Sequence, residues 1–374
     1  MTRSSTSRAV PGAIANWLFC VAALVVAIVI VGGITRLTES GLSITQWKPI
    51  SGVIPPLSDA AWQAEFDRYK QIPEYAAFNS DMTIEGFKSI FFWEYLHRLM
   101  GRLIGLAFAL PLAWFVIRGQ VPRGYLPRLI ALLMLGALQG TIGWWMVKSG
   151  LSERTDVSHL RLALHLMTAL FTLGGLVWTA LDLRALDRDP AAPPASLRLP
   201  ALAALVALAV QLMLGAFTAG LDAGYAFSTW PMMGDTLFPA GGWRDGWSAL
   251  ANAVDNPVVV QFLHRWIAFA TAAALLWLAA KAIKSGAPVL AMIVGILVVV
   301  QIGLGIATLT SGVAIVVAVA HQANAALLVI ATGAAAHAIG PRTTSASKQS
   351  SAVGNGLGDT GPNQRPEFTP ATLR

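Results

Sequence analysis

Long apolar runs separated by short polar and basic segments occupy most of the chain. A transmembrane helix needs about 20 predominantly apolar residues, and apolar runs of that length can be read directly from the pattern. Eight runs qualify, centred on residues 14–35, 91–117, 126–147, 158–181, 200–220, 258–280, 288–310 and 313–338. The pattern predicts an all-α polytopic membrane protein with eight transmembrane helices.

Composition and charge fit this prediction. Of the 374 residues, 55% are hydrophobic and 12% are charged, and a soluble protein would carry roughly twice that charged share. Basic residues precede the first run and fill the loops between alternate runs, so the positive-inside rule predicts cytoplasmic N and C termini. This topology accounts for the net charge of +7, and no nucleic-acid partner is expected.

Three segments outside the runs have distinct compositions. Residues 36–90 (the first outer loop) and residues 221–257 (the second outer loop) lie on the predicted outer side and are rich in Gly, Pro and Trp. Loops of this length usually cover something. Residues 341–374 are rich in Ser, Gly, Pro and Thr, which predicts a disordered cytoplasmic tail. Cys20 is the only cysteine, so an intrachain disulfide and a cysteine-based metal site are excluded.

The first four runs and the last four repeat one another. Thr35 matches Thr218 at an offset of 183 residues, and His97 matches His264 at an offset of 167. The same comparison pairs Arg98 with Arg265, Gln139 with Gln301, Gly143 with Gly305, and His165 with His321. Each unit contains an even number of spans, so both halves enter the membrane from the same side.

The repeat predicts two tandem four-helix bundles. Residues 1–182 form the first bundle with its outer loop, residues 183–199 form a cytoplasmic linker, and residues 200–340 form the second bundle. Within each half, the two helices that carry a repeated histidine run in the same direction, so they are expected to lie across a diagonal of the bundle.

The four repeated histidines lie at one depth. Each stands seven to nine residues past the outer boundary of its run, or roughly 10 to 14 Å at about 1.5 Å per residue. Two imidazoles facing each other across a bundle suit a six-coordinate haem iron, whereas a zinc site needs three or four protein ligands. Interhelical hydrogen bonding would explain any one of these histidines alone, but two matched pairs favour ligation.

The residues before the first histidine of each half differ. Glu94 precedes His97 by three residues, whereas Gln261 occupies the matching position before His264. A carboxylate inside an apolar helix is costly and is functional by default. Glu94 shares a helix face with His97 and could accept a proton or stabilise positive charge. A glutamine could do neither.

Four other polar residues in the runs have weaker interpretations. Arg98 and Arg265 each follow a repeated histidine, and their forked side chains suit haem propionates. Snorkelling toward lipid headgroups explains the two arginines equally well. His159 and His337 are not repeated and lie near the ends of their runs, so we assign them no ligand role.

These residues together resemble the haem A synthase family. The motif formed by Glu94, His97 and Arg98 is followed by His165, His264 and His321 in the later even-numbered runs, and the match covers essentially all eight runs. The resemblance implies a membrane oxidoreductase that converts the C8 methyl group of haem o to the formyl group of haem a. Two successive hydroxylations and loss of water give the aldehyde. Some bacterial members carry a cysteine pair in the outer loops, which is missing here, so a thiol-assisted step is not supported.

The resemblance also implies roles for residues and partners. His264 and His321 would hold a resident haem b that passes electrons, while His97 and His165 would line the pocket in which haem o is converted. Glu94 would be the essential carboxylate. Haem o synthase is the implied membrane partner, because so apolar a substrate is better handed over within the bilayer. The electron donor, the oxygen source and the oligomeric state, homo-oligomers included, are left open.

Two other functions compete with this interpretation. A two-haem b-type cytochrome that transfers electrons without forming a product explains the histidines, but it leaves the difference between Glu94 and Gln261 unexplained. A transporter would fit the internal repeat, but charges within the spans are scarce and no proline-broken midplane segments are evident. The short N-terminal stretch lacks an extended Arg-rich presequence, which favours a bacterial cytoplasmic membrane over a mitochondrion.

Overall fold

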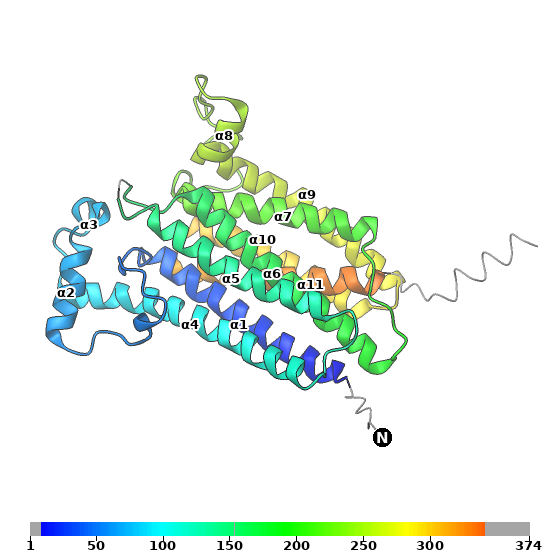
Figure 1. Cartoon of the computed structure of the whole chain (residues 1–374). Coiled ribbons are helices and arrows are strands. Elements are labelled where there is room, and N and C mark those ends of the chain that lie inside the picture. Colours follow the sequence, from blue (N-terminus) through cyan, green and yellow to red (C-terminus); the bar gives the residue numbers. More distant parts are fainter. Residues whose placement is uncertain (1–8, 153, 341–374) are drawn as a thin grey trace, which may run out of the picture.

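The computed structural model describes residues 9–152 and 154–340, and its regular structure there is helical throughout (Figure 1). In this part of the chain, eight helices are long and apolar enough to cross a membrane, which confirms the predicted fold class. They are α1 (Pro11–Leu37), α4 (Ile84–Ile117), α5 (Leu126–Lys148), α6 (His159–Arg188), α7 (Leu199–Gly220), α9 (Pro257–Lys284), α10 (Pro288–Thr310) and α11 (Ile315–Ile339). The predicted tail lies outside the described residues.

Proline and capping residues place the starts of several helices. α9 begins at Pro257 and α10 at Pro288, because the fixed φ of proline suits the first turn and its missing N–H is not needed there. The Asn256 side chain accepts a hydrogen bond from the N–H of Val258 and caps α9. α4 begins at Ile84, several residues before its apolar run, so it extends outward beyond the other spans of its half.

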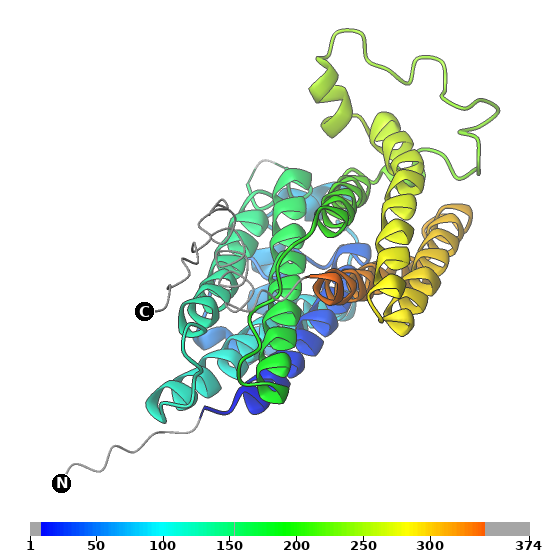
Figure 2. The same ribbon diagram turned by 90° about the vertical axis from the view of Figure 1, so that its right-hand side faces the viewer.

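The first half is organised around α1, which packs against α4 and α6, while α5 packs against α6 and α4. In the second half, α9 packs against α7 and α10, and α11 contacts all three of these helices. The histidine-bearing helices α4 and α6 are therefore separated by their neighbours, as a diagonal arrangement requires, whereas α9 and α11 touch directly. In Figure 2, α11 (orange) lies between α1 (blue) of the first half and α9 (yellow) of the second.

The two halves share an interface made by α1, α6, α7 and α11. Gln322 on α11 donates a 2.7 Å hydrogen bond to the carbonyl oxygen of Val29 on α1. α6 continues to Arg188, so the predicted linker at residues 183–199 is wrong at its start. Polar residues at the end of an apolar run do not stop a helix, and this one ends just before Asp189 and Pro190, where proline disfavours helix in the preceding residue. The division into two bundles stays an interpretation of the repeat.

Both outer loops contain short helices. The first holds η1 (Ser51–Val53), α2 (Asp59–Tyr69) and α3 (Pro73–Phe78), and the second holds η2 (Ala223–Tyr225) and α8 (Ala249–Asp255). Phe66 and Tyr69 pack their rings on Phe87 of α4, so the first loop has an aromatic core of its own.

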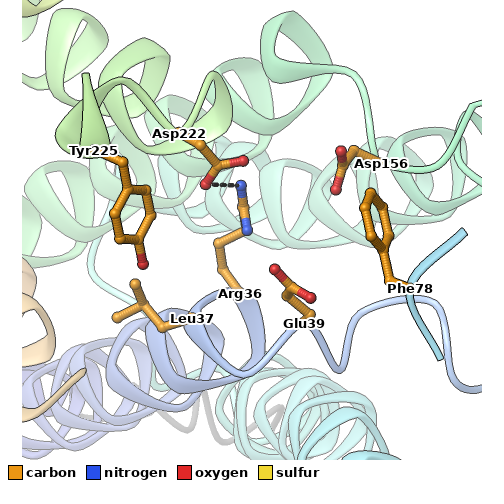
Figure 3. A pocket seen from close by; sticks show the side chains of 7 residues that line it. All are labelled: Arg36, Leu37, Glu39, Phe78, Asp156, Asp222 and Tyr225. Atoms are coloured by element: carbon orange, nitrogen blue, oxygen red, sulfur yellow. Dashed lines mark hydrogen bonds and ion pairs between the residues drawn. The ribbon is translucent and has the colours of Figure 1, made fainter. Parts of the chain in front are cut away.

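The outer loops meet beside a cavity of ≈ 330 Å³ at the outer end of the bundle. Arg36 of α1 forms a 2.8 Å ion pair with Asp222 there (Figure 3). Glu39 and Asp156 also line this cavity, which is therefore polar and separate from the transmembrane histidines.

Candidate functional site

The structure brings the repeated histidines together as two pairs of equal geometry. His97 on α4 faces His165 on α6 with ring centres 6.4 Å apart and ring planes at 87°. His264 on α9 faces His321 on α11 at the same distance and angle. We refer to these as the first pair and the second pair.

Each of the four imidazoles lies against a glycine of a neighbouring helix. The contacts are Gly32 with His97, Gly143 with His165, Gly215 with His264, and Gly305 with His321. A Cβ added at these glycines would lie 2.9 to 3.2 Å from the nearest ring atom, which is closer than ordinary van der Waals contact. The lack of a side chain at these glycines therefore leaves the space that the imidazole rings occupy.

Three of the histidines are also held by glutamines. The amide nitrogens of Gln139, Gln211 and Gln301 lie 3.0, 3.0 and 3.2 Å from the Nδ1 atoms of His165, His264 and His321, respectively. Each amide also donates to the backbone carbonyl oxygen of the same histidine, at 2.8, 2.9 and 3.2 Å. The glutamines therefore contact the ring nitrogen that is left over when Nε2 binds a metal.

The donor set of each pair fits a haem. Among the described residues there is no cluster of three or more His, Cys, Asp or Glu side chains that could hold a metal ion, so a metal bound here must bring its other ligands with it. A separation of 6.4 Å matches two metal–nitrogen bonds of about 2.0 to 2.1 Å plus about 1 Å from each nitrogen to its ring centre. A haem iron takes two axial histidines in addition to its four pyrrole nitrogens.

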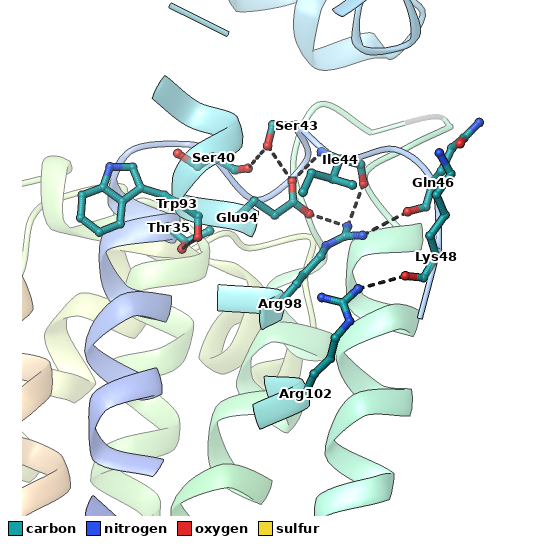
Figure 4. A network of polar contacts seen from close by, with 10 residues as sticks. All are labelled: Thr35, Ser40, Ser43, Ile44, Gln46, Lys48, Trp93, Glu94, Arg98 and Arg102. Atoms are coloured by element: carbon teal, nitrogen blue, oxygen red, sulfur yellow. Dashed lines mark hydrogen bonds and ion pairs between the residues drawn. The ribbon is translucent and has the colours of Figure 1, made fainter. Parts of the chain in front are cut away.

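Glu94, three residues before His97 on α4, belongs to a network of polar contacts at the outer end of the bundle (Figure 4). Its side chain is almost completely buried, and Oε2 accepts hydrogen bonds from Ser43 Oγ at 2.7 Å and from the N–H of Ile44 at 2.6 Å. Its Oε1 accepts a 2.5 Å hydrogen bond from Arg98 Nη2. Arg98 also donates to the carbonyl oxygens of Ile44 and Gln46. Glu94 and Arg98 thus hold the first outer loop onto α4.

The second half makes the equivalent attachment with the opposite polarity. Gln261 donates a 3.0 Å hydrogen bond to the carbonyl oxygen of Phe227, and its buried Oε1 has no partner among the described residues. Arg265 donates to the carbonyl oxygens of Phe227, Thr229 and Met232. Both arginines therefore bind loop backbone, and their pairing with propionates stays a prediction.

The unrepeated histidines have partners away from both pairs. His337 lies 2.9 Å from Asp182, which also forms a 2.6 Å ion pair with Arg128. His159 Nε2 lies 3.0 Å from the carbonyl oxygen of Val254. Each of these contacts connects the first half of the chain to the second. Neither histidine contacts a repeated histidine through these bonds.

Glu74 on α3 is a buried carboxyl that sequence reasoning did not single out. It is 4% exposed, and its Oε2 has no hydrogen-bond partner among the described residues. Burial, followed by the negative charges of Glu39, Glu94 and Asp156, raises the pKa of Glu74 to about 8. No sequence pattern marks it, since it lies in a loop without periodicity.

Known proteins match most of this chain. The family model of a cytochrome oxidase assembly protein, COX15-CtaA, matches residues 15–332. A heme A synthase from Rhizorhabdus wittichii is 60% identical over 331 residues, which cover 88% of this chain and 94% of that protein. The chain belongs to the haem A synthase family. Two further haem A synthases, from Sphingopyxis alaskensis and Novosphingobium aromaticivorans, are 56% and 51% identical over 89% and 91% of this chain, and over 94% and 98% of their own lengths.

Membership of the haem A synthase family confirms the predicted resemblance. Family membership implies an enzyme that involves haem. Together with the eight spanning helices, the bacterial relatives place the chain among multi-pass proteins of the bacterial inner membrane.

Proposed function

We propose that this chain is a haem A synthase that oxidises the C8 methyl group of haem o to the formyl group of haem a for cytochrome oxidase assembly. The reaction proceeds by two successive hydroxylations of the methyl carbon followed by loss of water. One observation carries this proposal. The rings of the two histidine pairs have the same separation and angle, but only in the first pair does a buried carboxylate, Glu94, lie one helical turn before a histidine.

The proposal divides the labour between the pairs. His97 and His165 hold haem o as substrate, and His264 and His321 hold a resident haem b, which supplies one-electron transfer when bound. The fit of two imidazoles to one iron supports both assignments. The polar difference between Glu94 and Gln261 supports placing the chemistry in the first half.

Glu94 acts on the substrate from one helical turn outside His97, since residues three apart on a helix share a face. A carboxylate at that place accepts a proton or stabilises positive charge that develops at the reacting carbon. Ser43, Ile44 and Arg98 hold it in one orientation. The same contacts close the first outer loop over the site, which keeps water from the reacting methyl group.

Arg98 and Arg265 are proposed to face the haem propionates from the outer side. Arg265 Nε is buried and has no hydrogen-bond partner among the described residues, so this N–H is available to a carboxylate. A forked guanidinium can bind loop carbonyls with some of its five donors and a propionate with another. Haem o synthase is the proposed membrane partner that delivers the substrate.

A direct conversion assay tests the proposed function. The purified protein with its bound haem is incubated with haem o and a reductant under air. The haems are then extracted, separated and identified by mass spectrometry. A formyl haem is expected. Haem bound at both pairs without any oxidised methyl product would instead support a two-haem b-type electron-transfer cytochrome. Labelled dioxygen and labelled water in parallel reactions identify the source of the oxygen atom.

A further inference from the structure

His97 is the exception among the four paired histidines. The other three rings each have the amide nitrogen of a glutamine at Nδ1. The Oε1 atoms of Gln139 and Gln211 are buried without a partner among the described residues, so rotation of the amide can bring an acceptor to the Nδ1–H of an imidazole that binds iron through Nε2. Among the described residues, no hydrogen bond reaches the ring of His97. Within residues 9–152 and 154–340, the only aromatic ring that packs against His97 is that of His165.

Ile28 stands at the position of the missing glutamine. On α7, Gln211 and Gly215 are four residues apart and share the face that contacts His264. On α1 the glycine at the matching offset of 183 residues is Gly32, and the residue four before it is Ile28. The position of Gln211 in the second half is therefore occupied by an apolar side chain, Ile28, in the first half.

The surroundings of His97 reflect this substitution. The Cδ1 of Ile28 reaches α4, where it lies 3.8 Å from the site of a Cβ on Gly101, one turn past His97. The ring of His97 is also turned differently, because a Cβ on Gly32 would meet its Nε2 at 3.2 Å. The glycines beside the other three histidines meet Cε1, at 2.9 to 3.0 Å. His97 thus has neither the partner nor the orientation of the other three.

We propose that Ile28 makes His97 the weaker, dissociable ligand of the first pair, while Gln139 makes His165 the stronger one. The proposal rests on the proposed function, which places haem o between these histidines. Outer hydrogen bonds strengthen a histidine as a ligand, and losing one typically costs 10- to 100-fold in metal affinity. A site that binds a substrate and releases a product needs an axial ligand that dissociates readily. A resident cofactor is bound more tightly when both axial histidines have a glutamine partner.

Carbon monoxide tests this, because it binds a six-coordinate ferrous haem only after an axial ligand leaves. The reduced full-length protein, with haem b loaded into both pairs, is mixed with carbon monoxide in a stopped-flow instrument. In the parent protein one haem per chain should bind the gas. Ile28→Gln should slow this binding by about 10-fold or more, and the matched control Ile28→Leu should bind at the parent rate. The reciprocal change Gln211→Ile should open the second pair to carbon monoxide.

Two histidine variants distinguish the roles of the two ligands and do not depend on whether Ile28→Gln folds. His97→Ala should keep haem at the first pair and bind carbon monoxide faster, whereas His165→Ala should lose that haem. The opposite pattern, or equal rates in the parent and Ile28→Gln at equal haem content, would overturn the proposal. Because no turnover is needed, haem that binds at the first pair but yields no formyl product refutes only the proposed function. A first pair that takes up no haem refutes both.

Discussion

The carboxylate of Glu94 accepts a 2.6 Å hydrogen bond from the backbone N–H of Ile44, so the first outer loop is attached to α4 through an acceptor. In the second half Gln261 makes the matching attachment as a donor. Conversion of one residue type into the other would therefore disturb both the charge and the hydrogen bonding at this point. The two histidine pairs have the same ring separation and interplanar angle, so the difference between the halves at this point is chemical.

Glu94→Gln should abolish formation of formyl haem. The amide removes the negative charge that the proposed chemistry needs, and loss of a general base or electrostatic group commonly costs 10²- to 10⁴-fold in rate. We expect at least a 100-fold loss by product analysis, with an unchanged optical spectrum of the haem at the second pair. Glu85→Gln, at an exposed position of the same helix, is the control and should retain conversion. Product formation by Glu94→Gln at the parent rate would contradict the role of this carboxylate.

Gly143→Ala should weaken haem binding at the first pair. An added Cβ would lie 2.9 Å from His165 Cε1, and forcing a methyl group into such a contact costs about 1 to 3 kcal/mol. The haem-to-protein ratio and the reduced spectrum measure the effect. Gly140→Ala on the same helix is the control, because nothing lies within 4 Å of a Cβ at that position. Equal haem content in the two variants would show that this ring is not tightly enclosed.

The helices and the histidine pairs could be predicted because both follow regular patterns in the sequence, namely apolar runs and an internal repeat. Apolar length alone defines a span, and constant offsets identify His97 with His264 without any knowledge of the fold. The hydrogen bonds of Ser43 and Ile44 to Glu94 could not be predicted, since they depend on how a loop without periodicity folds back onto α4. The sequence pattern likewise did not point to Ile28, because isoleucine is common in membrane helices. Its position becomes informative only once Gln211, the matching residue, is found to contact His264.

Asp182→Asn should destabilise the interface between the halves. The Asp182 carboxylate, which is 1% exposed, binds Arg128 of α5 and His337 of α11. Removing one member of a buried ion pair leaves the other charge uncompensated, and since Arg128 is partly exposed we expect a cost of about 3 kcal/mol. Unfolding of the detergent-solubilised protein by denaturant measures it. Asp67→Asn, at an exposed ion pair in the first outer loop, should change stability far less, because solvent screens exposed charges. Similar losses in both variants would contradict this prediction.

Glu74 should make the stability of the protein fall as the pH rises toward 8. Its pKa is about 8 in the folded protein against 4.5 for an ordinary glutamate, so between these values the folded chain keeps a proton that the unfolded chain releases. Stability then decreases by about 1.4 kcal/mol per pH unit from this group and levels off above the folded pKa. Glu74→Gln stays neutral throughout, so its apparent Tm should exceed that of the parent by a margin that grows from pH 5 to pH 8. Glu85→Gln, at an exposed position of α4, should follow the parent curve. Parallel curves for Glu74→Gln and the parent would show that this carboxyl releases its proton in the folded state at an ordinary pH.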